Sequence, residues 1–354
     1  MNARAQVLVS VLLAMASTGC ATPWMVPRAP GFTEVRALTR DGYSLALARR
    51  RPAGAPTGRP VLLVHGISAN DRNMDLHEGL SLAEWFAGRG REAWSLSLRG
   101  TGASQRREGR EPYAFDAFWR EDLPAAIARV RAETGADKVD VVAHSLGGMA
   151  LYAYLSQGGE GVGAAVTLGS PTRLDFGGTV TRLLPLLRPV FPPRGGTIPV
   201  VLPAQVFMPF HGQSERDPFL LLVANPENVP ATTWKRLVAN GLADAESEVV
   251  LQVANLLEFG RFASADGKTD FRADMARIRV PILVVAGKLD RLGSPLAARD
   301  GYRALGGPKA WRLYGVETGT RADYGHMDLL IGQHAEREVW PDLLDFLRRH
   351  GDSV

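Results

Sequence analysis

The stretch that decides the fold runs from Val139 to Gly148 and is Val-Asp-Val-Val-Ala-His-Ser-Leu-Gly-Gly. An apolar run is followed by a serine, and a helical pattern begins directly after it. So sharp a strand-to-helix turn strains the serine backbone and leaves room only for small side chains two positions to either side. Ala143 and Gly147 fill these positions. The pattern indicates that Ser145 is a nucleophile, and an ordinary junction with a capping serine is the alternative.

A carboxylate and then a histidine follow in the order that such a nucleophile requires, each in a loop after a later strand. Residues 280–286 predict a buried parallel strand, and Asp290 comes shortly after it. His326 lies in the loop beyond the last predicted strand. We expect Ser145 to attack, His326 to act as the base and Asp290 to orient the imidazole. Asp328 is the rival acid, although side chains only two residues apart seldom face one another across a loop.

Another buried strand, predicted at 60–64, ends in His-Gly and offers backbone donors to the same site. Acyl transfer builds negative charge on the carbonyl oxygen, and one preorganised N–H donor contributes about 3 kcal/mol. The amides of Ile67 and Leu146 are the predicted oxyanion hole, while a plain glycine turn is the alternative. Four neighbouring residues are expected to shape the site: His65, Gly66, His144 and Gly147.

Taken together, these motifs resemble the α/β-hydrolase superfamily, and the resemblance spans residues 34–350. Two stretches resemble its acid-lipase branch: the opening hairpin at 41–49, and the histidine loop with the start of the final helix at 324–341. The resemblance implies a serine esterase or lipase that hydrolyses a carboxylic ester, with a small-molecule or lipid ester as substrate. A Ser-His-Asp triad requires neither a metal nor an organic cofactor.

The apolar runs and helical patterns alternate along the chain, which favours a mostly parallel twisted sheet with helices on both faces. We expect residues 34–170 and 276–354 to form this α/β core. The interval 171–275 breaks the alternation and is the predicted cap or lid insertion. No acidic residue lies between Phe176 and Ser214. So apolar a segment should cover an apolar cleft or meet lipid, and we expect it to select the acyl chain.

Residues 1–19 have the pattern of a bacterial signal peptide: a basic start, an apolar run too short to span a membrane, and small residues before Cys20. We expect Cys20 to be lipidated, which makes the protein an exported lipoprotein held at a membrane of the bacterial envelope. Cys20 is the only cysteine, and an exported protein with one thiol would otherwise carry an unpaired reactive group. Secretion without an anchor, including to the periplasm, is the alternative. Residues 20–33 are the expected tether, because three prolines oppose regular structure.

The 354 residues, 45% of them hydrophobic, suffice for one sizeable core with an inserted subdomain. The net charge of +4 is not concentrated in a basic tract, so nucleic-acid binding is not indicated. The basic run 49–51 is expected to be a solvated edge. Two other functions stay open, an acyltransferase on the same fold and a non-catalytic surface lipoprotein that acts as a binding module. The sequence leaves the natural ester and the oligomeric state undetermined.

Overall fold

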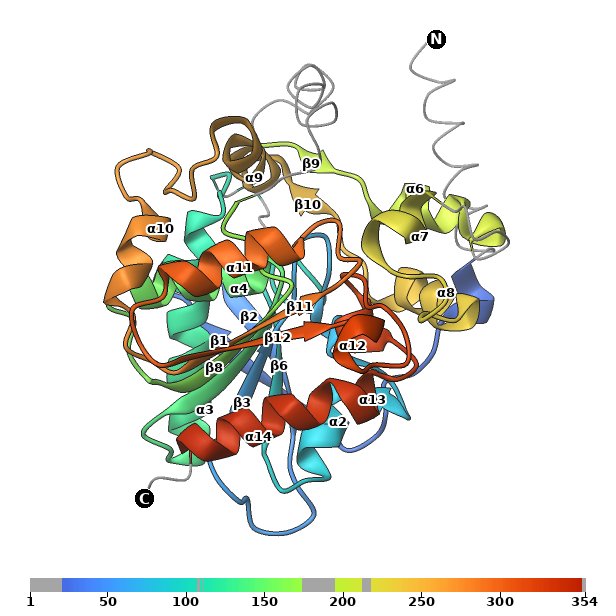
Figure 1. Cartoon of the computed structure of the whole chain (residues 1–354), viewed down its shortest axis with the longest axis horizontal. Coiled ribbons are helices and arrows are strands. Elements are labelled where there is room, and N and C mark those ends of the chain that lie inside the picture. Colours follow the sequence, from blue (N-terminus) through green and yellow to red (C-terminus); the bar gives the residue numbers. More distant parts are fainter. Residues whose placement is uncertain (1–20, 107–108, 110, 174–194, 212–217, 352–354) are drawn as a thin grey trace.

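An eight-stranded sheet forms the centre of the molecule (Figure 1). The computed structural model describes residues 21–106, 109, 111–173, 195–211 and 218–351. In the order β1-β2-β6-β3-β7-β8-β11-β12, the β1–β2 and β2–β6 pairs are antiparallel and the other pairs are parallel. The strands are β1 (Phe32–Leu38), β2 (Ser44–Arg50), β3 (Val61–Val64), β6 (Ala93–Ser97), β7 (Val139–His144), β8 (Val162–Leu168), β11 (Ile282–Gly287) and β12 (Lys309–Tyr314).

Helices cover both faces of this sheet, because successive side chains of a buried strand point to opposite sides. Along β3, Val61 and Leu63 pack with one helical layer, whereas Leu62 and Val64 pack with the other. The first layer holds α2 (Leu82–Ala87) and α14 (Trp340–Gly351), and the second holds α3 (Leu123–Thr134), α4 (Leu146–Ser156) and α11 (Pro295–Ala304). Figure 1 shows α14 and α2 below the sheet and α4 and α11 above it. The expected mostly parallel sheet with two helical layers is confirmed.

Short elements connect these parts. One π-helical turn, η3 (Phe118–Asp122), leads into α3, and a two-stranded hairpin precedes α2. The remaining short elements of the core are η2 (Asp71–Asn73), β4 (Asp75–His77), β5 (Leu80–Ser81), η7 (Val316–Thr318), α12 (Asp328–Ile331) and α13 (Ala335–Glu338).

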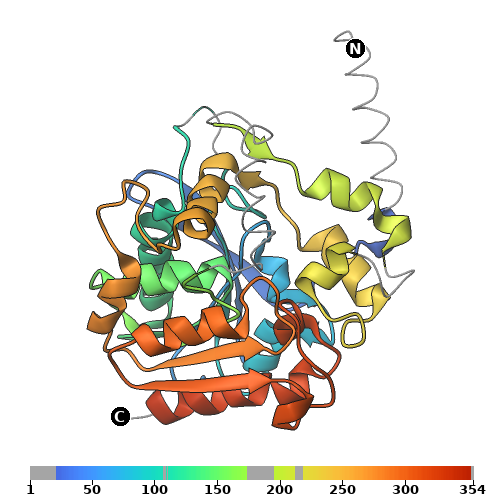
Figure 2. The same cartoon turned by 45° about the horizontal axis from the view of Figure 1, so that its top comes forward.

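The predicted cap interval 171–275 has two parts in the structure. Its described residues 195–211 and 218–246 contain β9 (Thr197–Ile198), α6 (Val201–Val206), η5 (Met208–Phe210), α7 (Pro218–Val223), α8 (Ala231–Asn240) and β10 (Ala245–Glu246). Figures 1 and 2 show the helices of this part as a lobe beside the sheet. We call this lobe the cap. The elements after it are α9 (Ser247–Phe259), α10 (Phe271–Asp274) and η6 (Met275–Arg277). They supply Val249, Leu256, Phe271 and Met275 to the apolar cluster of α3 and α4, so this return segment packs on the core.

The N-terminal segment differs from the expected free tether. Residues 1–20, with the predicted signal peptide and Cys20, lie outside the described residues. From Ala21 onward the chain lies against the cap, where η1 (Thr22–Trp24) contacts α8. The side chain of Asn240 accepts from the Val26 amide at 3.2 Å and donates to the Trp24 carbonyl at 3.0 Å. The prolines do exclude a long helix, but side chains of the protein satisfy the irregular backbone instead of water. Beyond Asn240 of the cap, Arg72 and Arg50 of the core donate to the carbonyls of residues 26, 29 and 30.

The basic run 49–51 also differs from expectation. Arg49 and Arg50 are buried, and each is paired with an acid. The Nε of Arg49 lies 2.7 Å from Glu92, and Arg50 lies 3.0 Å from Asp75. The prediction of a solvated edge was therefore wrong for these two arginines, because carboxylates distant in sequence take the place of water.

Candidate active site

The turn between β7 and α4 holds Ser145 in a strained backbone conformation, with φ 54° and ψ −122°. Among the described residues other than glycine, only Ser145 and Ser68 have a positive φ. Gly147 allows the turn to approach β3. A Cβ at that position would lie 2.5 Å from the carbonyl oxygen of His65 and 2.9 Å from that of Val64. The hydroxyl-bearing residue is thus fixed at the carboxyl edge of the sheet by close backbone packing.

His326 and Asp290 meet at this edge, from the loops after β12 and β11. The Nδ1 of His326 lies 2.8 Å from Oδ2 of Asp290. Oδ1 of Asp290 accepts the amides of Leu292 at 2.9 Å and Gly293 at 2.7 Å. These bonds hold the carboxylate as an acceptor toward the imidazole, so the Nδ1 proton points to Asp290 and Nε2 is the ring nitrogen left for chemistry.

The rival acid, Asp328, makes different contacts. Its carboxylate accepts the Asn225 amide at 3.0 Å and the Asn228 side-chain amide at 3.1 Å, both from the segment that follows α7. Burial raises the pKa of Asp328 to about 7, although hydrogen bonds from Asn225, Gly325 and Asn228 act in the opposite direction. Asp328 therefore connects the histidine loop to the cap, and the contact with His326 belongs to Asp290.

Ser145 and His326 line one cavity of about 280 Å³. His144 lies between the elbow and the histidine loop, with its ring centroid 4.5 Å from that of His326. Its Nε2 lies 3.1 Å from the backbone carbonyl of His326. Burial lowers the pKa of His144 well below its usual value, so the ring is neutral and can donate to that carbonyl. His144 thereby supports the backbone that carries the candidate base.

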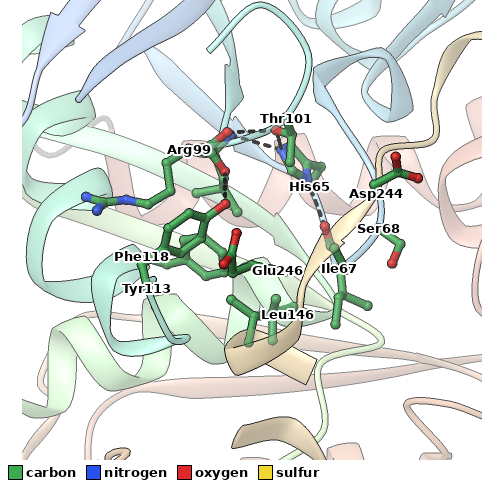
Figure 3. Close-up of a pocket in the computed structure, with 14 residues that line it drawn as sticks. His65, Ile67, Ser68, Arg99, Thr101, Tyr113, Phe118, Leu146, Asp244 and Glu246 are labelled. Carbon is green, nitrogen blue, oxygen red and sulfur yellow. Dashed lines mark hydrogen bonds between the residues drawn. The ribbon is translucent and has the colours of Figure 1, made fainter. Parts of the chain in front are cut away.

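Ile67 lines this cavity, and Leu146 directly follows Ser145. Among the described residues, neither of their backbone amides has a hydrogen-bond acceptor in the protein. Both residues line a small pocket of about 20 Å³, which they approach from separate elements (Figure 3). Two amides without partners beside a strained serine can receive the charge of an oxyanion.

His65 shapes the loop that carries the first of these amides. Its Nε2 accepts the Leu98 amide at 3.0 Å and lies 3.2 Å from the Thr101 hydroxyl, while Nδ1 lies 2.8 Å from the Gly66 carbonyl (Figure 3). Burial lowers the pKa of His65 to about 4. The ring is therefore neutral at pH 7, with its proton on Nδ1. Gly66 is constrained as well, since a Cβ there would lie 2.8 Å from the Ser145 Cβ.

Most of the cavity wall could not be recognised from the sequence pattern. Cap side chains form much of it, namely Val200, Ala204, His211, Val223, Trp234, Leu237, Val238 and Leu242. The helical spacing of Trp234, Leu237 and Val238 predicted packing within the cap, and these buried side chains also face the cavity. His211 carried no local signal, because it reaches the site only through the fold of the cap. Within the described ranges, no group of three or more His, Cys, Asp or Glu residues could hold a metal ion.

The family can now be assigned. The sequence matches the family model described as the alpha/beta hydrolase fold over residues 59–333. The chain belongs to this family. It is also similar to lipase lipl-1 of Caenorhabditis elegans, with 23% identity over 88% of this chain and 86% of that lipase.

The chain is also similar to two further proteins. Gastric triacylglycerol lipase of Rattus norvegicus is 32% identical over 32% of either protein. An esterase from Thermogutta terrifontis has the same fold, with a TM-score of 0.55 and 18% identity over 90% of this chain and 99% of the esterase. The resemblance to the acid-lipase branch is confirmed as distant homology to lipases, the gastric enzyme included.

Proposed function

We propose that this α/β-hydrolase cleaves carboxylic esters with a lipid-like acyl group through a Ser145-His326-Asp290 triad. The observation that carries the proposal is the Asp290–His326 contact of 2.8 Å at the edge of a cavity that also holds the strained Ser145. The amides of Ile67 and Leu146, which have no protein acceptor within the described residues, support it as an oxyanion hole.

The reaction has two halves, which share one base. Ser145 Oγ attacks the ester carbonyl carbon as its proton passes to His326 Nε2, and the amides of Ile67 and Leu146 stabilise the tetrahedral oxyanion. The C–O bond to the alcohol then breaks, and His326 returns the proton to the leaving oxygen. Water attacks the acyl-enzyme in the same way, and the acid and free Ser145 are released. Asp290 stays ionised and stabilises the imidazolium formed in each half.

The cavity supports an apolar acyl group as the substrate moiety. Its walls are mostly aliphatic and aromatic, and they include Trp234, Leu237 and Val238 from α8 and Met327 from the histidine loop. Similarity to lipases agrees with such a substrate. Because the cap supplies these walls, we propose that it sets the preferred length of the acyl chain.

Hydrolysis of nitrophenyl esters of increasing chain length tests the function. Ser145→Ala should lower kcat by about 10⁴-fold or more, since the nucleophile is lost while binding remains. A fluorophosphonate should label Ser145, as mapped by mass spectrometry. Ser68→Ala is the matched control for labelling, because it removes the other serine hydroxyl with a positive φ from the same cavity. Equal rates for the wild type and Ser145→Ala would remove the proposal.

Export and lipidation remain part of the proposal, and they rest on the sequence before Ala21. Processing that is blocked by globomycin, together with release of a Cys20→Ser variant from the membrane fraction, would support a lipid at Cys20. A variant that stays in the membrane fraction would show that lipidation is not what retains the protein.

A further inference from the structure

The segment from Pro203 to His211 is apolar on two opposite sides. Its inner side carries three buried residues at helical spacing, Ala204, Met208 and His211. Two of them, Ala204 and His211, line the cavity. Three others at helical spacing point outward and are exposed: Pro203, Phe207 and Phe210. Phe207 is 59% exposed and Phe210 is 66% exposed. One turn of chain therefore separates the substrate cavity from an outer apolar surface.

The described segment that carries these three exposed side chains has no charged residue. Residues 195–211 contain no Lys, Arg, Asp or Glu. On the neighbouring helix α7, Leu222 is 42% exposed, while the next residue, Val223, lines the cavity. Exposed phenylalanine side chains on an uncharged segment of this kind are normally covered by protein or by lipid. We name Pro203, Phe207 and Phe210 the docking face.

The start of the described chain lies at the same lobe. Ala21 is buried, and η1 contacts α8, which in turn contacts α6. The amine of Lys235 on α8 lies 5.0 Å from the ring centroid of Trp24. Figures 1 and 2 both show this first segment, in blue, beside α8. Cys20 is bonded to Ala21, and adjacent Cα atoms are about 3.8 Å apart. A lipid on Cys20 would therefore enter its membrane next to the cap.

We propose that the docking face binds the surface of a lipid bilayer and orients the cap toward it. The occupant is a bilayer because the chain that precedes Ala21 contains an apolar run and a candidate lipidation site and joins the body at this lobe. Within the described ranges, every helix is too short or too polar to traverse a bilayer, which fits contact at the surface. A lipid ester from the outer layer then has only the α6–η5 wall between it and the cavity. This inference concerns binding and goes beyond ester hydrolysis.

Fluorescent labels at chosen positions test the orientation directly. Because Cys20 is the only cysteine, Cys20→Ser gives a cysteine-free full chain. Phe207→Cys or Phe210→Cys in this background would carry a polarity-sensitive fluorophore. Leu38→Cys is the control, since Leu38 is 74% exposed on edge strand β1. With vesicles of phosphatidylethanolamine and phosphatidylglycerol, labels at 207 and 210 should shift to the blue and resist aqueous iodide, while the label at 38 should not.

The outcomes separate docking from catalysis, because the same labels can be read in a Ser145→Ala chain. No vesicle-dependent shift at 207 and 210, with or without binding through another surface, would overturn the proposal. A shift that appears without vesicles as the protein concentration rises would also overturn it, because that result would show that the docking face binds a second copy of the chain. In the unlabelled chain, Phe207→Ser with Phe210→Ser should lower the vesicle-bound fraction several-fold relative to Leu38→Ser. Hydrolysis of a soluble short-chain ester checks that each variant is folded, and an unchanged bound fraction would also contradict the proposal.

Discussion

The carboxyl edge of the sheet and the cap beside it are held in different ways. At the edge, buried strands and short backbone contacts fix Ser145, His326 and Asp290. The cap consists of short helices, and α8, the longest of them, has ten residues. Helices this short are marginal alone, so the cap depends on contacts with the core. One such contact is the hydrogen bond of 2.7 Å from the Met327 amide to the Val223 carbonyl. We infer that the edge determines the chemistry and the cap determines which substrate reaches it.

Substitutions of the two buried aspartates near the histidine loop should differ most in their effect on kcat. Asp290→Asn should lower kcat by about 10⁴-fold with little change in KM, the loss known when the acid of a serine protease triad is replaced in this way. Asp328→Asn should lose about tenfold or less, because Asp328 bonds to Asn225 and Asn228 and not to His326. Steady-state kinetics on one ester measures both. Similar losses in the two variants would mean that the cap contact is as important for catalysis as the triad contact.

Asp328 also gives a pH test of the connection between cap and core. Burial raises its pKa to about 7, whereas an aspartate in an unfolded chain titrates near 3.9. Between these values the folded protein keeps a proton that the unfolded chain releases. The contribution of this group to the free energy of unfolding therefore falls as the pH rises from about 4 to about 7 and is constant above that.

Asp328→Asn removes this titration. Relative to the wild type, the variant should gain stability with rising pH by on the order of 1 kcal/mol per pH unit across that window. Urea unfolding at several pH values measures the difference, and exposed Asp345 on α14 provides a control as Asp345→Asn. Parallel stability curves for the wild type and Asp328→Asn would show that the carboxyl does not titrate in this range.

The core was predictable from the sequence because its signals are local. The apolar runs predicted the strands, and the helical patterns at 146–156 and 295–304 have the same bounds as α4 and α11. The elbow pattern and the order of Asp290 and His326 then selected one edge of the sheet, since parallel strands bring their carboxyl ends together.

The cap was not predictable to the same depth. Composition indicated an insertion within 171–275, but it did not show that the elements after β10 pack on the core, and it gives no partners for the short helices of the cap. Contacts between distant residues decided where His211 lies, how Asn240 holds the segment after Ala21, and why Arg49 and Arg50 are buried. Hydrogen bonds and ion pairs of this kind leave no periodic trace in a single sequence.

A glycine substitution tests how closely the elbow is packed. Gly147→Ala places a Cβ 2.5 Å from the backbone carbonyl oxygen of His65, and a backbone atom cannot rotate away. We expect a loss of about 1–3 kcal/mol in the free energy of unfolding, as for overpacked sites in general, together with lower activity. Gly54→Ala is the control, because nothing lies within 4 Å of the added Cβ. Thermal unfolding of both variants measures the effect, and equal midpoints would argue against a tightly packed turn.

A change in the cap should alter specificity and leave the chemistry intact. Val238 is buried on α8 and lines the cavity, so Val238→Phe reduces the space for the distal part of an acyl chain. We expect kcat/KM to fall about tenfold for long-chain nitrophenyl esters, since filling a hydrophobic pocket by a few carbon atoms changes binding by about 1–3 kcal/mol. The value for the acetate should stay within about twofold, because Ser145 and the oxyanion amides are untouched. Val130→Phe, on core helix α3, controls for overpacking as such. An equal loss on short and long esters would contradict the division between an edge that carries the chemistry and a cap that selects the chain.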